Sequence, residues 1–131
     1  MNDSEVAMPE MGWILVIEDD DASAEMLIEL LAFAGYRADA AGTLRQAVAA
    51  MKTEKYAAAL VDLTLAGSTT EELIKQLMAI PRRPPVVIFS ARVPDELAAA
   101  GQRLEAAAVL QKPASMEKLL GTLARVIKHA A

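Results

Sequence analysis

Four consecutive acids stand near the start of the sequence, directly after an apolar run. The run is WILVI (13–17), and the acids are Glu18, Asp19, Asp20 and Asp21. Like charges crowded at the end of a buried strand repel one another, so something must offset the charge. Asp20 and Asp21 also have a simpler interpretation, because acids at the start of a helix can cap it or favour the positive end of its dipole.

Polar groups follow three later apolar runs as well. Asp62 follows AAALV (57–61), Ser90 follows VVIF (86–89), and the triplet Gln111, Lys112 and Pro113 follows AAVL (107–110). Together with Glu18 and Asp19 these make three carboxylates, one hydroxyl and one ammonium. If they converge, a hard divalent cation would relieve the repulsion, since such a cation favours oxygen ligands.

The four apolar runs predict the strands that would position these groups. They lack polar alternation, as expected of strands that are covered on both faces. A fifth segment, YRADA (36–40), alternates and predicts a half-exposed edge strand. Segments of helical period separate the strands, and the order βαβαβαβαβα predicts an α/β fold. A parallel sheet with helices on both faces follows, because right-handed crossovers return the chain to the same end of the sheet.

The ends of the helical segments carry suitable residues. Gly35 suits the C-terminus of the first helix, Pro94 suits the first turn of a helix over 94–104, and Ser115 suits the N-cap of a helix over 115–130. In a parallel sheet the residues after each strand lie at the carboxyl edge, where doubly wound folds bind ligands. Any one of them alone could be a solvated loop group or a cap, but four successive strand ends of this kind predict a site.

Composition bounds the class of protein. The 131 residues are 54% apolar, enough for one domain with a real core, and the net charge of −5 argues against a nucleic-acid or anionic-membrane surface. Cysteine is absent, which suits a reducing compartment, and no run approaches the length of a membrane helix. We expect a cytoplasmic protein with a flexible tail at residues 1–11 and one domain at 12–131.

Four segments resemble the receiver domain of two-component response regulators, CheY-like domains that carry phosphorelay signals. They are ILVIEDD (14–20), VDLTLAG (61–67), VVIFSA (86–91) and VLQKP (109–113), in the family's order and approximate spacing. The resemblance extends from about residue 12 to residue 128. It implies a flavodoxin-like, five-stranded (βα)5 fold with strand order 2-1-3-4-5.

The resemblance also implies a role for each site residue. Asp62 would be the phosphoacceptor, Ser90 the hydroxyl that contacts the phosphoryl group and Lys112 its ammonium partner. Magnesium would be held by an acidic ligand set and one backbone carbonyl, namely Glu18, Asp19, Asp62 and the carbonyl of Thr64. The bond between Lys112 and Pro113 would be cis, a form that proline makes accessible.

The implied chemistry is phosphoryl transfer to a carboxylate rather than enzymatic turnover. The donor would be a histidine kinase, a histidine phosphotransfer protein or acetyl phosphate, and the protein would contribute positioning and charge neutralisation. The aspartyl phosphate would hydrolyse slowly. A single-domain response regulator that signals through protein contacts, with no nucleic-acid or membrane partner, is the function we expect.

Three positions depart from the family pattern. Val109 stands where an aromatic residue is usual, Ala66 replaces the usual proline four residues after the phosphoacceptor, and LEAAA (104–108) replaces a glycine-containing turn. Valine is stiff and has no polar group with which to alternate between two rotamers. We therefore expect phosphorylation to change the Val109 face little, and a receiver-like adaptor or phosphate sink is the alternative function.

Other classes fit the sequence less well. A haloacid-dehalogenase-like phosphatase needs a second aspartate two residues after its nucleophile, where this chain has Thr64. A hydrolase triad would have to use His129, near the end of the last helix, where with Lys128 it better suits the negative end of the dipole. A nucleotide-binding module needs a glycine-rich loop after the first strand, and EDDDAS has no glycine.

Overall fold

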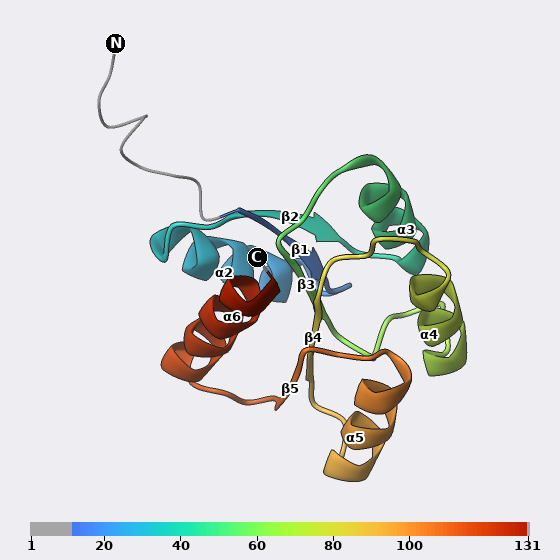
Figure 1. The fold of residues 1–131 in the computed structure, drawn as a ribbon. Coiled ribbons are helices and arrows are strands. Elements are labelled where there is room, and N and C mark those ends of the chain that lie inside the picture. Colours follow the sequence, from blue (N-terminus) through green and yellow to red (C-terminus); the bar gives the residue numbers. More distant parts are fainter. Residues whose placement is uncertain (1–11, 131) are drawn as a thin grey trace.

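A computed structural model describes residues 12–130, so the tail expected at 1–11 lies outside the described residues. Strands and helices alternate along this part of the chain (Figure 1). The strands are β1 (Trp13–Ile17), β2 (Arg37–Ala41), β3 (Ala58–Val61), β4 (Val86–Ser90) and β5 (Ala108–Gln111). The helices are α2 (Asp21–Phe33), α3 (Leu44–Thr53), α4 (Thr70–Met78), α5 (Pro94–Arg103) and α6 (Met116–Ala130). The α/β alternation predicted from the sequence is confirmed.

The strands form one parallel sheet between two layers of helices. Their order is β2-β1-β3-β4-β5, as the family resemblance implied. Helices α2 and α6 cover one face, and α3, α4 and α5 cover the other (Figure 1). This is the doubly wound, flavodoxin-like arrangement.

The central strand β1 shows why the sheet forms where it does. Its side chains point alternately to the two faces, so Leu15 and Ile17 join the core under α3 to α5, while Ile14 and Val16 join the core under α2 and α6. All four are at most 1% exposed. Burying each one stabilises the fold by roughly 1.5–3 kcal/mol, which fixes the position of the residues that follow the strand.

The predicted helix ends are confirmed. Gly35 has a φ of 97° directly after the last turn of α2, a conformation that glycine adopts at little steric cost. Pro94 is the first residue of α5. Ser115 accepts a hydrogen bond from the backbone N–H of Lys118 at 3.1 Å and so caps α6.

The interpretation of 107–110 as a strand covered on both faces is wrong. Within residues 12–130, strand β5 pairs only with β4 and forms an edge of the sheet, and Val109 is 39% exposed. A short run of alanine, valine and leucine reads as buried in any position, because residue type does not reveal which strand is last in the sheet. The edge position predicted for β2 is confirmed.

The segment that replaces the family's glycine-containing turn still forms a turn. Helix α5 ends at Arg103, and Glu105 adopts a φ of 52°, which non-glycine residues adopt only at a cost. Its carboxylate accepts a hydrogen bond from Arg83 at 3.0 Å. The helix-favouring sequence LEAAA therefore does not extend α5 into β5.

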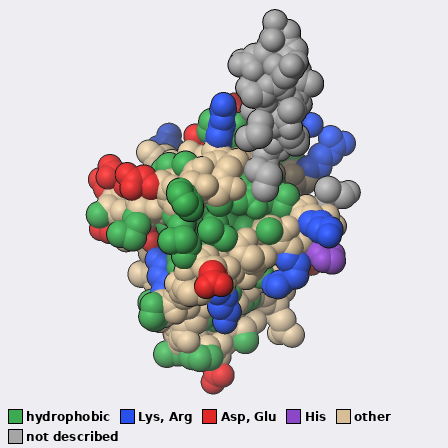
Figure 2. Space-filling model, turned by 90° about the vertical axis from the view of Figure 1, so that its left-hand side faces the viewer, with side chains coloured by type: hydrophobic (Ala, Val, Ile, Leu, Met, Phe, Trp, Pro, Cys, Tyr) green, Lys and Arg blue, Asp and Glu red, His purple; other side chains and the backbone are tan. Residues whose placement is uncertain are grey.

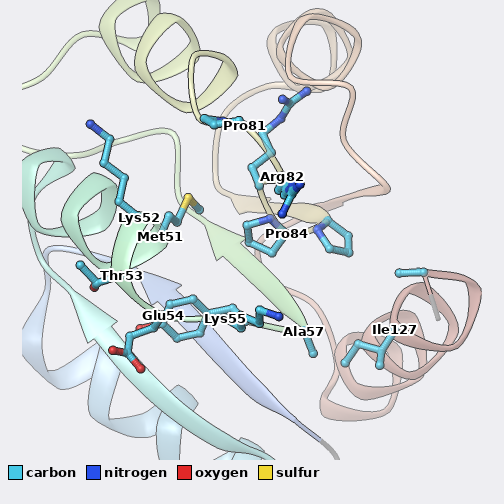
Figure 3. A pocket seen from close by; sticks show the side chains of 14 residues that line it. Met51, Lys52, Thr53, Glu54, Lys55, Ala57, Pro81, Arg82, Pro84 and Ile127 are labelled. Carbon is cyan, nitrogen blue, oxygen red and sulfur yellow. The ribbon is translucent and has the colours of Figure 1, made fainter.

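The amino edge of the sheet carries a cavity of about 710 Å3. It lies where α3 ends and β3 and β4 begin, and Figure 3 shows basic side chains around it. These include Lys52, Lys55, Arg82 and Arg83. The C-termini of helices point to this edge and carry partial negative charge, so basic residues are stabilised here.

The side of the molecule formed by α2 and α6 is chemically mixed. Figure 2 views this side, and hydrophobic side chains appear there among acidic and basic ones. Met26 and Phe33 of α2 are 70% and 86% exposed. Among residues 12–130, no helix combines the length and apolar character needed to cross a membrane.

Candidate functional site

The carboxyl edge of the sheet brings together four of the predicted site residues. Glu18 follows β1, Asp62 follows β3, Ser90 ends β4 and Lys112 follows β5. The ammonium of Lys112 lies 2.9 Å from Glu18 Oε1 and 3.1 Å from Asp62 Oδ2. Parallel strands in register carry these residues to one point, as the sequence predicted.

Asp62 is held by three donors from three segments. The backbone N–H of Thr64 donates to Oδ1 at 2.9 Å, the hydroxyl of Ser90 donates to the same oxygen at 3.0 Å, and Lys112 donates to Oδ2. The side chain of Asp62 is 12% exposed. The carboxylate is therefore fixed in orientation but still reachable from solvent.

Lys112 is the cation of the site. Burial alone would lower the pKa of its ammonium, but hydrogen bonds to Glu18 and Asp62 and the charges of both carboxylates outweigh burial, so the pKa lies above its usual value. The ammonium also lies 5.2 Å from the centre of the Phe89 ring. The peptide bond between Lys112 and Pro113 is cis, as the resemblance implied.

Glu18 is the most buried acid of the opening cluster, at 6% exposure. Its Oε1 accepts from Lys112, and its Oε2 accepts from the backbone N–H of Asp20 at 3.1 Å. Each oxygen thus has a donor, which lowers the cost of burying the charge. The repulsion noted in the sequence is offset here by an ammonium and a backbone N–H.

The three aspartates after Glu18 serve different purposes. Asp19 Oδ2 accepts from the backbone N–H of Ala66 at 2.7 Å and so ties two loops together. Asp20 caps α2 by accepting from the N–H and hydroxyl of Ser23, and the side-chain hydrogen bond is the main cause of its lowered pKa. Asp21 begins α2 and is exposed. Of the two candidates for the cap, Asp20 fills the role.

The chemistry of the predicted metal ligands fits magnesium, but their arrangement is not a ready ligand set. Glu18, Asp19 and Asp62 supply hard oxygens at one edge. In the conformation described for residues 12–130, however, no three or more acidic or histidine side chains are grouped so that they could hold a metal ion. Lys112 and the N–H of Ala66 occupy the carboxylate oxygens instead. The roles of Glu18, Asp19, Asp62 and the Thr64 carbonyl as magnesium ligands remain predictions.

Arg92 is a residue at this edge that the sequence reasoning did not single out. Its Nε donates to Thr64 Oγ1 at 2.9 Å, and its own carbonyl accepts from the side chain of Gln111 at 3.1 Å. Gln111 was noted only as a residue at a strand end. The position of Arg92, two residues after the hydroxyl residue Ser90 at the end of β4, is the sequence signal that could have identified it.

His129 lies far from these groups. It is in the last turn of α6, whose final residue Ala130 lines the cavity at the amino edge. The site at the carboxyl edge therefore has no histidine, and a Ser-His-Asp triad cannot form from His129.

Comparison with known proteins agrees with this geometry. The family model described as response regulator receiver domain matches residues 14–124. The sensory/regulatory protein RpfC of Xanthomonas campestris pv. campestris is 36% identical over 115 residues, which cover 85% of this chain and 16% of that protein. The chain thus spans about a sixth of that relative's length.

Solved structures show the same fold. The crystal structure of a sensor protein from Polaromonas sp. JS666 has a TM-score of 0.83 at 29% identity, covering 92% of this chain and 99% of that one. A CheY-like receiver domain from Methylobacillus flagellatus has a TM-score of 0.76 at 31% identity, covering 87% and 97%. With a family match that extends over most of the sequence, this chain belongs to the response regulator receiver domain family.

Proposed function

We propose that this receiver accepts a phosphoryl group on Asp62 from a histidine kinase or histidine phosphotransfer protein, in a magnesium-dependent reaction. The observation that supports it best is the position of Asp62. Its carboxylate is oriented by Thr64 and Ser90 and paired with Lys112, at the edge of the sheet where ligands of this fold bind. Signalling would then proceed through protein contacts.

Asp62, Lys112 and Ser90 would each contribute a different part of the phosphoryl transfer. A carboxylate oxygen of Asp62 forms a bond to phosphorus as the bond between phosphorus and the donor's leaving group breaks. Lys112 provides positive charge for the transferred oxygens, and the Ser90 hydroxyl can donate to one of them instead of to Asp62. The leaving group takes its proton from the donor side or from water. Positioning and charge account for most of the catalysis in such a transfer.

Magnesium, when bound, would neutralise phosphoryl oxygens as they approach the acidic edge. Glu18, Asp19, Asp62 and the carbonyl of Thr64 are the groups that would hold it. Asp19 Oδ2 accepts from the N–H of Ala66, and Lys112 pairs with Glu18 and Asp62, so these side chains would reorient if they held the metal. This rearrangement is a proposal, and the affinity for magnesium is its direct test.

A second candidate function is a receiver-like adaptor or phosphate sink that switches little. One observation favours it. Val109 packs so closely on α5 that a Cβ added at Gly101 would lie 2.8 Å from Val109 Cγ2. A stiff side chain in such contact has little room to change rotamer when Asp62 is modified.

The test is incubation with acetyl phosphate and magnesium, followed by intact-protein mass spectrometry. We expect one phosphoryl group on the wild type and none on Asp62→Asn. Asp21→Asn is the matched control, since it removes an exposed acid from the first turn of α2 and should still be phosphorylated. Circular dichroism should show that both variants fold. Uptake by Asp62→Asn equal to that of the wild type would exclude Asp62 as the acceptor.

A further inference from the structure

Arg92 connects the site to helix α5 and to strand β5 at the edge of the sheet. Its Nε donates to Thr64 Oγ1, and the backbone N–H of Thr64 donates to Asp62 Oδ1, both at 2.9 Å. Thr64 therefore links the guanidinium of Arg92 to Asp62, the proposed phosphoacceptor. On its other side, Arg92 Nη1 lies 3.6 Å from Glu96 Oε2 in the first turn of α5.

The backbone of Arg92 makes a second connection. Its carbonyl accepts from Gln111 Nε2 at 3.1 Å, and Gln111 is the last residue of β5, directly before Lys112. Ser90, which donates to Asp62, lies two residues before Arg92. A shift of Arg92 would therefore be transmitted to α5 through its side chain and to β5 through its backbone.

The present partners of the guanidinium are weak ones. Thr64 offers a neutral hydroxyl, and Glu96 is an i,i+4 partner at 3.6 Å with a side chain that is 53% exposed. Exposed pairs of this type contribute little to stability. Arginine prefers bidentate binding to an anion with adjacent oxygens, such as a phosphoryl group.

We infer that Arg92 is a phosphoryl-sensing residue: when Asp62 carries a phosphoryl group, Arg92 exchanges Thr64 and Glu96 for phosphoryl oxygens. This rests on the proposed function of Asp62 and adds to it a route by which the modification is read. The first turn of α5 then loses the contact between Glu96 and Arg92. The hydrogen bond from Gln111 to the Arg92 carbonyl moves with the loop that follows β4. This route does not require Val109 to change rotamer.

The exchange also changes a surface groove. Arg92 and Arg103 line the same cavity of about 240 Å3 between α4 and α5, and Arg103 bridges the two helices by pairing with Glu71. Departure of Arg92 opens the end of the groove nearest Asp62, while the Arg103 end stays closed.

The experiment compares wild type, Arg92→Gln and Arg92→Lys, with Arg103→Gln as the matched control. Arg103→Gln removes an arginine from the same groove but from outside the site. Affinity for beryllofluoride with magnesium is measured by calorimetry, and amide hydrogen exchange is followed over residues 62–69, 91–97 and 108–112. Phosphoryl uptake from acetyl phosphate is measured separately by mass.

In the wild type and in Arg103→Gln, we expect beryllofluoride to change exchange in the first turn of α5 and at the end of β5. In Arg92→Gln the change in the first turn of α5 should be lost, while changes remain in the loops that follow β3, β4 and β5, where Asp62, Ser90 and Lys112 would meet the phosphoryl mimic directly. Affinity should fall by about fivefold, typical of one lost charge-assisted contact that is partly exposed. Arg92→Lys should bind beryllofluoride with intermediate affinity, since lysine keeps the positive charge but lacks the paired guanidinium donors that bind an anion in bidentate fashion.

Two results would overturn the inference. If Arg92→Gln shows wild-type affinity and exchange changes that still reach α5, Arg92 does not sense the phosphoryl group, although Asp62 can still accept it. If the wild type takes up no phosphoryl group at all, the proposed function fails and this inference fails with it. Mass spectrometry separates the two cases.

Discussion

Lys112 Nζ lies 2.9 Å from Glu18 Oε1, joining the end of the last strand to the end of the first. The two residues are 94 positions apart in the chain. Glu18 is almost fully buried, whereas Lys112 is 26% exposed, so the ammonium covers a carboxylate that solvent hardly reaches. Removing Lys112 leaves the buried charge of Glu18 without its cation, whereas removing Glu18 leaves Lys112 paired with Asp62.

Lys112→Gln should lower the free energy of unfolding without magnesium by about 1–3 kcal/mol, because Glu18 and Asp62 lose their shared cation. Urea denaturation measures the change. Lys118→Gln removes the same charge from an exposed position on α6 and should have an effect within about 0.5 kcal/mol. Equal effects in the two variants would mean that the pairing does not stabilise the fold.

Asp19→Ala should abolish magnesium binding and magnesium-dependent phosphorylation if Asp19 is a metal ligand. Titration calorimetry tests this, and Asp21→Ala should bind magnesium as the wild type does. Without metal, relief of repulsion raises stability, while loss of the hydrogen bond from Ala66 lowers it, so the two effects oppose each other. Unchanged magnesium affinity in Asp19→Ala would remove Asp19 from the ligand set.

Gly101→Ala should destabilise the protein by about 1 kcal/mol, although alanine favours helices over glycine. Its Cβ would lie 2.8 Å from Val109 Cγ2, and the cost of that overpacking exceeds the gain in helix propensity. Gly121→Ala in α6 meets no atom within 4 Å and should stabilise by about 0.5–1 kcal/mol. Adding Val109→Ala to Gly101→Ala should restore part of the loss. Thermal denaturation of the wild type, the two single glycine variants and the double variant measures these differences in stability.

Tyr56→Phe should cost about 1 kcal/mol near neutral pH, since the Tyr56 hydroxyl donates to Asp39 Oδ2 at 2.8 Å. Burial, followed by that hydrogen bond and nearby negative charge, raises the pKa of Tyr56 above its usual value. The folded state therefore keeps a proton that the unfolded chain loses above about pH 10. Stability gained from Tyr56 is complete below that pH and declines above it.

The difference between wild type and Tyr56→Phe should accordingly shrink as pH rises from about 9 to 11. Denaturant midpoints measured at each pH provide the comparison, and other groups that titrate there, including Tyr36, cancel between the two proteins. A difference that stays constant over this range would show that the pKa of Tyr56 is the same in the folded and unfolded states.

Much of the fold could be predicted because local signals agree with one another. Runs such as WILVI fix strands by burial, and Gly35, Pro94 and Ser115 fix helix ends through backbone geometry and capping. The exposed edge at β5 could not be read from AAVL. A run of that kind has the same composition at the centre of a sheet as at its edge.

The site was predictable in membership but not in pairing. Strand ends that share an edge must converge, so Glu18, Asp62, Ser90 and Lys112 were expected together, and the structure places them within hydrogen-bonding reach. Which donor satisfies which acid depends on side-chain reach between loops. That is why the N–H of Ala66 on Asp19 and the guanidinium of Arg92 on Thr64 could not be foreseen.

The placement of charge along the strands affects how a donor arrives. Acids from Glu18 to Asp21 and Asp62 crowd the reactive edge, while Lys52, Lys55, Arg82 and Arg83 gather at the other. A small anion diffusing in dilute buffer would be repelled from the edge where the proposed transfer takes place, and added salt would weaken that barrier over a screening length of about 8 Å at physiological strength. A protein donor with a basic rim would instead be drawn in and turned so that its phosphorylated side chain meets Asp62 first.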